Sequence, residues 1–216
     1  MNVVRGFERR LERLLEGMAG KVFSGRLHPS EIAGRLAREA DFARFDHETG
    51  PATANLYTLI VHPADLTTDP AHLEESLTAE LERYTTDEGL RLEGPCRVVI
   101  DTDEGVPQGN LVCHVEVAPG LPVPWARLVS GDESFEVGRN RALVGRSDTA
   151  DVVLPYDEVS RRHALIWREG GRAWVIDLGS ANGTTLDGHP VSRSPRSVEQ
   201  GSVVGFAGHG FRWAEG

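Results

Sequence analysis

The stretch "EVSRRHALI", Glu158 to Ile166, places a serine, two adjacent arginines and a histidine directly before a run of apolar residues. Taken alone, the stretch is compatible with a catalytic Ser/His site, a basic patch for nucleic acid, a phosphate-binding loop, or a hairpin loop without a binding role. The sequence on either side of it separates these possibilities.

From Trp125 onward the sequence consists of short β-like runs separated by turn signals, such as "ALVG", "AWVIDL" and "SVVGF". "WREGGRAW" predicts a hairpin through Gly170–Gly171, and "TLDGHPV" predicts a tight one through Asp187–Gly188, because these pairs tolerate positive φ. Many short strands at close spacing, with no helix between them, are typical of a β-sandwich.

A catalytic site is the weakest interpretation of Ser160 and His163. A Ser/His/acid triad needs the serine oxygen on the imidazole and an acid such as Asp157 behind it, and closeness in sequence does not produce that geometry. No GxSxG elbow is present. We therefore expect no enzymatic activity, no cofactor and no catalytic residue.

An anion site explains the residue types better. Phosphate binding requires a guanidinium together with short neutral donors. "LVGRSDTADVVL" supplies Arg146, "EVSRRHALI" supplies Ser160 and Arg161, and "DLGSANGTTLDG" supplies Asn182. Each stretch lies at the end of an expected strand, where the loops of a sandwich meet.

In their order and spacing these stretches resemble the forkhead-associated (FHA) domain. The matching motifs are Gly145-Arg146, Ser160-Arg161-Arg162-His163 and Asn182-Gly183-Thr184. The resemblance covers residues 125–216 and implies an all-β sandwich whose loops bind phosphothreonine peptides. It further implies that Arg146 pairs with the phosphate, Ser160 donates its hydroxyl to it, Arg161 adds charge, and Asn182 holds the peptide main chain.

The same resemblance implies structural support from four further positions: close packing at Gly145, loop anchoring by His163, a turn at Gly183, and Thr184 beside it. In an extended chain Arg162 points away from Arg161, into solvent. The sequence departs from the family pattern at Ala181, where a Thr or Ser able to touch the ligand is common. The tripeptide "VGR" occurs twice, at 137–139 and 144–146, and only the second copy has the spacing to Ser160 that the FHA pattern requires. We therefore expect Arg139, in the first copy, and Arg141, just after it, to be charged residues on the surface.

The first half of the chain is expected to be α+β. Helical periodicity covers "VVRGFERRLERLLEGMAGKVF", "HPSEIAGRLAREAD" with Ser30 as cap, and "DPAHLEESLTAELERYTTDEG" with Asp69 as cap. "NLYTLIVHP" reads as a strand that ends at Pro63. "CRVVIDTD" and "GNLVCHVEVAP" read as two strands joined by a hairpin loop, "EGVPQGN". The order α-α-β-α-β-β predicts a small sheet covered by helices.

"GFERRLERLLEGMAGKVFSGRLHPSEIAGRLAREAD" resembles the N-terminal domain of actinobacterial FHA proteins of the FhaA type. The Pro/Gly-rich "APGLPVP" marks the domain boundary. We therefore expect an FhaA-like domain at 1–118, a short linker at 119–124, and an FHA domain at 125–216. Better-known relatives carry a long low-complexity linker between these domains, which the short one here replaces.

Together the resemblances imply a cytoplasmic adaptor in bacterial Ser/Thr-kinase signalling. Its partners would be phosphothreonine-containing proteins, among them a Ser/Thr kinase and membrane-anchored proteins of cell-wall synthesis or division. The alternative is a structural protein that uses the FHA fold as a scaffold and binds without phosphorylation, which Ala181 leaves open. Thr67–Thr68 and Thr85–Thr86 fit phosphorylation sites less well than helix caps and turns.

Composition argues against several other classes of protein. The 216 residues carry a net charge of −10, and the 12 basic and 21 acidic residues at positions 1–124 place −9 of it in the first half. This balance disfavours nucleic-acid binding. No run is long enough to insert in a membrane. The histidines and the two cysteines lack metal-ligand spacing, so we expect no metal, and Cys96 and Cys113 read as reduced core residues.

Overall fold

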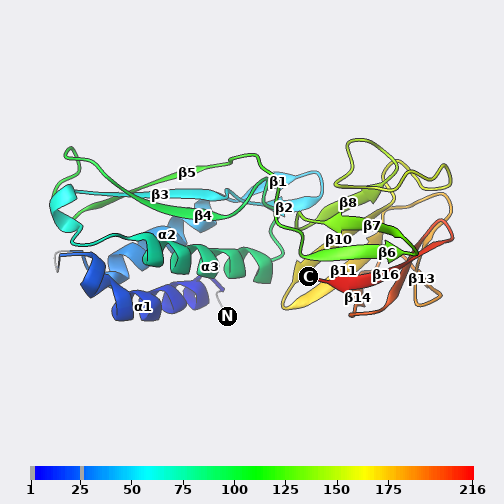
Figure 1. Ribbon diagram of the computed structural model, residues 1–216, viewed down its shortest axis with the longest axis horizontal. Coiled ribbons are helices and arrows are strands. Elements are labelled where there is room, and N and C mark those ends of the chain that lie inside the picture. The colour runs from blue at the N-terminus through cyan, green and yellow to red at the C-terminus, as the bar shows by residue number, and fades with distance from the viewer. Residues whose placement is uncertain (1–2, 25–26) are drawn as a thin grey trace. The chain divides into compact units, whose positions relative to one another are not determined.

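The computed structural model describes residues 3–24 and 27–216, which form two compact units (Figure 1). The N-terminal unit contains the chain up to Phe45 together with Ala52–Thr85 and Leu92–Gly120. The C-terminal unit contains Leu121–Gly216 and two short segments from earlier in the chain, Asp46–Pro51 and Thr86–Arg91. The first unit is α+β and the second all-β, which confirms the expected fold class.

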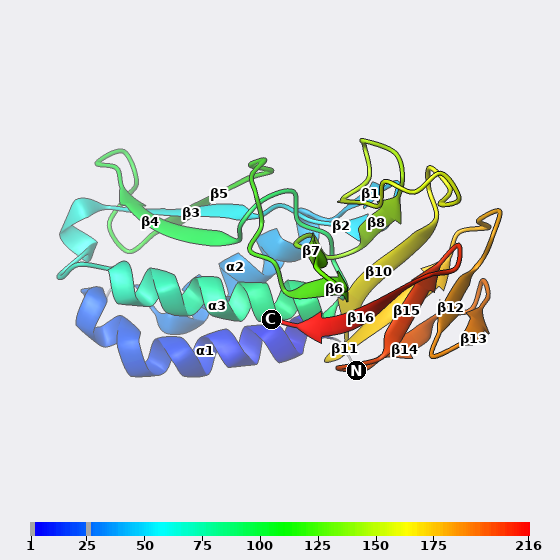
Figure 2. The same cartoon turned by 45° about the vertical axis from the view of Figure 1, so that its right-hand side comes forward.

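Three helices lie on one face of the sheet in the N-terminal unit: α1 Val3–Val22, α2 Pro29–Phe42 and α3 Ala71–Asp87 (Figures 1 and 2). Phe7, Leu11 and Leu15, spaced four residues apart, are fully buried along α1. The Phe7 ring stacks on Tyr84 of α3 with centroids 4.3 Å apart. Helix α1 is therefore stabilised mainly by burial of this apolar stripe.

The caps of these helices differ in part from expectation. Asp69 caps α3 as predicted, because its Oδ1 accepts a hydrogen bond from the Ala71 amide at 3.1 Å. The prediction that Ser30 caps α2 is wrong. His28 occupies that position, and its Nδ1 accepts from the Ser30 amide at 3.3 Å.

The sheet of the N-terminal unit has the strand order β4-β3-β5. Strand β3 (Leu56–Val61) pairs in parallel with β4 (Arg97–Thr102) and antiparallel with β5 (Leu111–Glu116). The prediction of a hairpin between β4 and β5 is therefore wrong, since β3 lies between them. A crossover through α3 places β4 parallel to β3, and β5 then pairs antiparallel with the other edge of β3.

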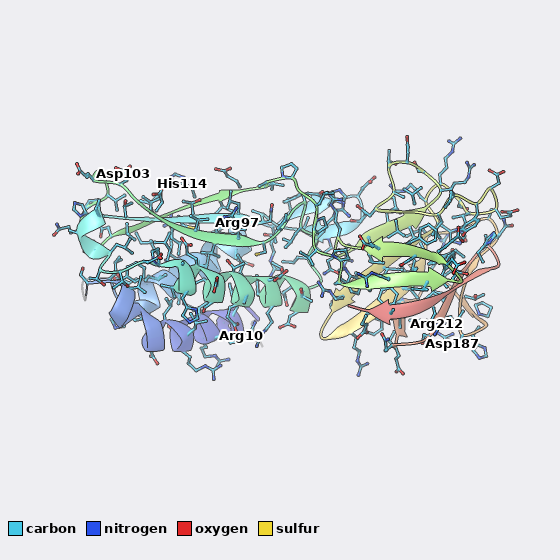
Figure 3. The ribbon with its side chains drawn as sticks, viewed as in Figure 1. Arg10, Arg97, Asp103, His114, Asp187 and Arg212 are labelled. Atoms are coloured by element: carbon cyan, nitrogen blue, oxygen red, sulfur yellow. The ribbon has the colours of Figure 1, made fainter. Side chains whose placement is uncertain are left out.

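A short hairpin of β1 (Phe45–His47) and β2 (Gly50–Ala52), which the sequence did not predict, precedes β3 along the chain. Most of this hairpin is the segment Asp46–Pro51 of the C-terminal unit. A 3-10 turn, η1 (Pro63–Asp65), follows β3. Arg97 and His114, labelled in Figure 3, are exposed beside buried neighbours, so they lie on the sheet face turned away from the helices.

Both cysteines of the N-terminal unit are free and buried. Burial raises the pKa of Cys96 and that of Cys113 to about 12. Neither thiol forms a thiolate at neutral pH, so both act as small apolar residues, as the sequence predicts.

The C-terminal unit is a sandwich of two sheets, with strand orders β14-β11-β10-β8-β9 and β13-β12-β15-β16-β6-β7. All pairs are antiparallel except β8 with β9. The core between the sheets includes Trp213, Phe206 and Phe211. The strands are β6 Ala126–Ser130, β7 Glu133–Val137, β8 Ala142–Gly145, β9 Val152–Val153, β10 Ala164–Glu169, β11 Arg172–Asp177, β12 Thr184–Leu186, β13 His189–Val191, β14 Arg196–Val198, β15 Val203–Phe206 and β16 His209–Glu215.

Both predicted hairpins are confirmed. Gly170 and Gly171 connect β10 to β11 with φ of 58° and 74°, and Asp187 and Gly188 connect β12 to β13 with φ of 50° and 77°. The Asp187 carboxylate, labelled in Figure 3, accepts hydrogen bonds from the Val203 amide and the Ser202 hydroxyl. These bonds support a non-glycine residue at positive φ.

The two early segments of the C-terminal unit attach to the sandwich through arginines. Arg141 is half-buried. Its guanidinium donates to the carbonyl oxygens of Thr49 and Gly89 and lies 5.2 Å from the centre of the Trp167 ring. Arg139 Nη1 lies 3.7 Å from Asp151. The expectation that both arginines are surface charge is therefore wrong, because they are committed to partners within the unit.

The chain between the last strand of the first sheet and the first strand of the sandwich, residues 117–125, contains no helix or strand. The predicted domain limits stay a prediction, since the compact C-terminal unit also includes the two earlier segments. Across the described residues, none of the helices has both the length and the apolar character of a membrane span.

Candidate functional site

Three loops meet at one end of the sandwich: the β8–β9 loop with Arg146, the β9–β10 loop with Ser160 and Arg161, and the β11–β12 loop with Asn182. The Arg146 amide donates to the Ser160 carbonyl oxygen at 3.1 Å, and the Ala181 amide donates to Ser160 Oγ at 3.0 Å. The structure thus brings together the loops that carry all four predicted ligand-binding residues.

Gly145 permits a close approach between the end of β8 and the β9–β10 loop. A Cβ atom at this position would lie 2.1 Å from the carbonyl oxygen of Arg161 and 3.0 Å from that of Ser160. Both are backbone atoms that cannot rotate away. A glycine is therefore required for the strand end before Arg146 to pass beside Ser160 and Arg161.

His163 links two loops from inside the protein. It is fully buried; its Nδ1 accepts from the Ser160 amide at 3.1 Å, so Nε2 carries the proton and donates to the Gly183 carbonyl oxygen at 3.0 Å. Burial lowers the pKa of His163, against the opposing effects of the Gly183 hydrogen bond and the Asp177 carboxylate. The imidazole is thus a neutral brace that does not reach the protein surface.

Asp177, at the end of β11, organises the loop with Asn182, and sequence reasoning missed it. Its carboxylate accepts from the amides of Gly179 and Ser180 at 2.7 and 2.9 Å and from the hydroxyls of Ser180 and Thr184 at 2.6 Å each. Burial raises the pKa of Asp177, but these hydrogen bonds outweigh it and leave the pKa below its usual value. The pattern "DLGS", an acid before a glycine turn, was the signal available.

The residues that face solvent are those able to bind a ligand. Arg146, Arg161 and Asn182 are exposed, and Ser160 is half-buried. Within residues 3–24 and 27–216, neither Arg146 nor Arg161 has an ion-pair or hydrogen-bond partner for its guanidinium. Two unpaired guanidinium groups and a hydroxyl on adjoining loops are donors suited to an anion with several oxygens, such as a phosphate ester.

The side chains of Ser160 and Asn182 each form one hydrogen bond within the protein and can form another with a ligand. Ser160 Oγ accepts from the Ala181 amide, which leaves its proton free to donate. Asn182 Nδ2 donates to the Glu158 carbonyl oxygen at 2.8 Å. Its Oδ1 has no partner within the described chain and can accept from the N–H of an extended peptide.

Arg162 lies outside this group. Its Nη1 forms an ion pair with Glu48 Oε2 at 2.8 Å, where both side chains are largely exposed. The side chain thus has a partner rather than only water around it. A pair this exposed contributes little to stability.

The geometry does not form a Ser/His/acid triad. His163 Nδ1 is bound to the backbone amide of Ser160, while the hydroxyl of Ser160 is bound to the Ala181 amide. Among the described residues there is also no group of three or more His, Cys, Asp or Glu side chains arranged to hold a metal ion.

Two family models match the chain. The model of the FhaA N-terminal domain matches residues 4–114, just over half of the chain, and the FHA domain model matches residues 142–207. The second match contains the three loops described above.

The chain is also similar to named bacterial proteins. It is 33% identical over 88 residues to the glycogen accumulation regulator GarA of Mycolicibacterium smegmatis, covering 41% of this chain and 49% of that protein. It is 44% identical over 54 residues to FhaB of Mycobacterium tuberculosis, covering 25% of this chain and 35% of that protein. The chain spans about half or less of the length of these relatives.

One solved structure, of the FhaA FHA domain in complex with the intracellular domain of another protein, is 29% identical with a TM-score of 0.37. It covers 41% of this chain and 96% of that chain. A second, from a study of phosphothreonine-dependent FHA domain interactions, is 28% identical with a TM-score of 0.38. It covers 42% of this chain and 94% of that chain.

Proposed function

Because the chain belongs to the family of the FhaA N-terminal domain and carries an FHA domain after it, we propose that it is a phosphothreonine-binding adaptor. The observation that carries the proposal is that two hydrogen-bonded loops present two exposed arginines without side-chain partners among the described residues, Arg146 and Arg161, together with the Ser160 hydroxyl. A phosphate group carries nearly two negative charges and three acceptor oxygens, which these donors match.

The roles within the site are proposed residue by residue. Arg146 forms the main charge-assisted contact with the phosphate, and Arg161 adds a second positive charge. Ser160 donates its hydroxyl to a phosphate oxygen. Asn182 accepts from the main chain of the peptide through Oδ1 and so fixes the peptide relative to the phosphate.

The remaining predicted residues act by holding these groups in place. Gly145 allows the close approach of the loops, His163 joins the loop with Ser160 to Gly183, and Thr184 anchors the Asp177 carboxylate. Ala181 supplies only its backbone amide, which supports Ser160 and offers no side-chain contact to a ligand.

As an adaptor of this kind, the protein acts in the cytoplasm without catalysis of its own. Its partners are phosphothreonine-containing proteins of Ser/Thr-kinase signalling, including a kinase and membrane-anchored proteins of cell-wall synthesis or division. We propose an FhaA-like domain at 1–118, a linker at 119–124 and an FHA domain at 125–216, with the first domain contacting a further partner.

A peptide-library selection tests the proposal. The full chain is immobilised and exposed to three degenerate peptide libraries whose fixed central residue is phosphothreonine, phosphoserine or threonine. We expect enrichment only from the phosphothreonine library, and none by the Arg146→Ala variant. Equal enrichment from the unmodified threonine library would instead support a scaffold that binds without phosphorylation.

A further inference from the structure

The loop that presents Arg146 ends at Asp151, immediately before β9. Asp151 Oδ2 accepts from the Leu143 amide at 2.8 Å. Leu143 lies in β8, which leads into the loop, so this bond joins the exit of the loop to its entry. The position of Asp151 therefore constrains the residues between them, including Arg146.

Arg91 holds the Asp151 carboxylate from outside the sandwich strands. Arg91 Nη1 lies 2.7 Å from Oδ2 and Nη2 lies 2.9 Å from Oδ1, so the pair is bidentate. The two side chains are only 6% and 11% exposed. A bidentate, desolvated pair has a fixed geometry, and replacing Arg91 would leave the buried Asp151 carboxylate with the longer, 3.7 Å ion pair to Arg139 Nη1.

Arg91 is itself fixed within the C-terminal unit. It ends the segment Thr86–Arg91, and its amide donates to the Pro51 carbonyl oxygen at 2.9 Å. Arg91 Nη1 also donates to the Arg141 carbonyl oxygen at 3.2 Å. The Leu90 carbonyl oxygen accepts from Asn140 Nδ2 at 3.2 Å. The guanidinium of Arg91 thus approaches Asp151 from a backbone anchored on both sides.

We propose that Arg91 is a positioning residue of the phosphate-binding site, acting through Asp151 on the loop that carries Arg146. The proposal rests on the phosphothreonine-binding function stated above. Arg91 fixes the end of the loop, and it also neutralises a carboxylate five residues from an arginine that must attract an anion. Phosphopeptide affinity then depends on a residue that lies outside the predicted FHA domain at 125–216.

The test compares full-length variants that disturb the same region differently. Arg91→Met removes the charge and keeps much of the side-chain volume. Arg141→Met is the matched control, because it removes the contacts to Thr49 and Gly89 but leaves Arg91 and Asp151 paired. Arg91→Lys keeps the charge without the bidentate geometry. Each variant is titrated with one phosphothreonine peptide from the library selection, at a temperature where all are folded.

We expect Arg91→Met to weaken binding by about tenfold and Arg91→Lys by less, while Arg141→Met changes it by no more than about threefold. A second readout is amide hydrogen exchange at Arg146 and Ser147, whose N–H groups donate to the carbonyl oxygens of Ser160 and Arg161. Exchange at these two amides should accelerate in Arg91→Met and stay unchanged in Arg141→Met. If Arg91→Met does not fold, Arg91→Lys takes its place in both measurements.

The positioning role would be overturned if a folded Arg91→Met protein had the phosphopeptide affinity and amide exchange of wild type. If Arg146→Ala still failed to bind the phosphopeptide, the proposed function would remain intact. Equal losses in Arg91→Met and Arg141→Met would also overturn it, since the effect would then be general destabilisation. Absence of phosphothreonine binding by the wild-type protein would overturn both proposals.

Discussion

His163 Nε2 donates a hydrogen bond to the carbonyl oxygen of Gly183 across 3.0 Å, which joins the loop with Ser160 to the loop with Asn182. The same carbonyl oxygen accepts from the Ala207 amide at 3.0 Å. The exposed side chains that we propose bind the phosphopeptide therefore lie on loops that are joined through the buried His163. Variants of that network should change affinity as well as stability.

The lowered pKa of His163 predicts a pH dependence of stability. Because the folded pKa lies below the unfolded value of 6.5, the unfolded chain binds the proton more readily, and lowering the pH through this interval favours unfolding. Stability should be complete above pH 6.5 and fall as the pH drops towards the folded pKa. Urea unfolding of wild type and His163→Gln at about pH 7.5 and 5.5 measures this. A loss on acidification as large in His163→Gln as in wild type would contradict the assignment.

Replacing Asp177 by Ala should detach the β11–β12 loop. The carboxylate accepts four hydrogen bonds, so we expect a loss of about 3 kcal/mol in unfolding free energy and weaker phosphopeptide binding. Denaturant unfolding and peptide titration give the two values. Asp132→Ala, at an exposed turn, is the control and should change stability by less than about 0.5 kcal/mol. Equal effects of the two variants would argue against the role of Asp177.

Gly145→Ala should separate the loops by a backbone clash. With a carbonyl oxygen 2.1 Å from the added Cβ, the strand end must shift, and we expect destabilisation of about 1–3 kcal/mol with loss of peptide binding. Gly17→Ala in α1 meets no atom within 4 Å and should instead raise stability by about 0.5–1 kcal/mol with unchanged binding. Thermal unfolding and titration distinguish them. A Gly145→Ala protein that binds like wild type would refute the packing argument.

The neighbours Arg161 and Arg162 should behave differently. The Arg161 guanidinium has no partner among the described residues, whereas that of Arg162 is paired with Glu48. We expect Arg161→Ala to weaken phosphopeptide binding by about tenfold at low salt and Arg162→Ala by less than about threefold. Titrations at two salt concentrations measure this. A larger loss in Arg162→Ala than in Arg161→Ala would reverse the assignment of the two side chains.

The sandwich was predictable because its turns have local signatures. Gly170–Gly171 and Asp187–Gly188 mark hairpins through their tolerance of positive φ, which the structure bears out. The three loop motifs were also recognisable, because their order and spacing along the chain resemble those of the FHA domain. Asp177 was identifiable in principle from "DLGS", since an Asp before a glycine turn commonly accepts from the amides that follow it.

The other differences arise from contacts between distant parts of the sequence. Arg91 and Asp151 are 60 positions apart, and nothing in either neighbourhood names the other. Arg141 binds backbone carbonyl groups of Thr49 and Gly89, which have no sequence signature. The strands at 97–102 and 111–116 look like a hairpin locally. Only the pairing of each with β3 shows otherwise.

The central claim is that the three loops bind phosphothreonine through Arg146. One peptide from the library selection, synthesised with phosphothreonine, phosphoserine or threonine at the central position, is titrated calorimetrically into wild type and Arg146→Ala. We predict binding of the phosphothreonine form alone, weakened at least about thirtyfold by Arg146→Ala through loss of a charge-assisted contact. Equal affinity of wild type for the unphosphorylated peptide, or full affinity in Arg146→Ala, would contradict the account.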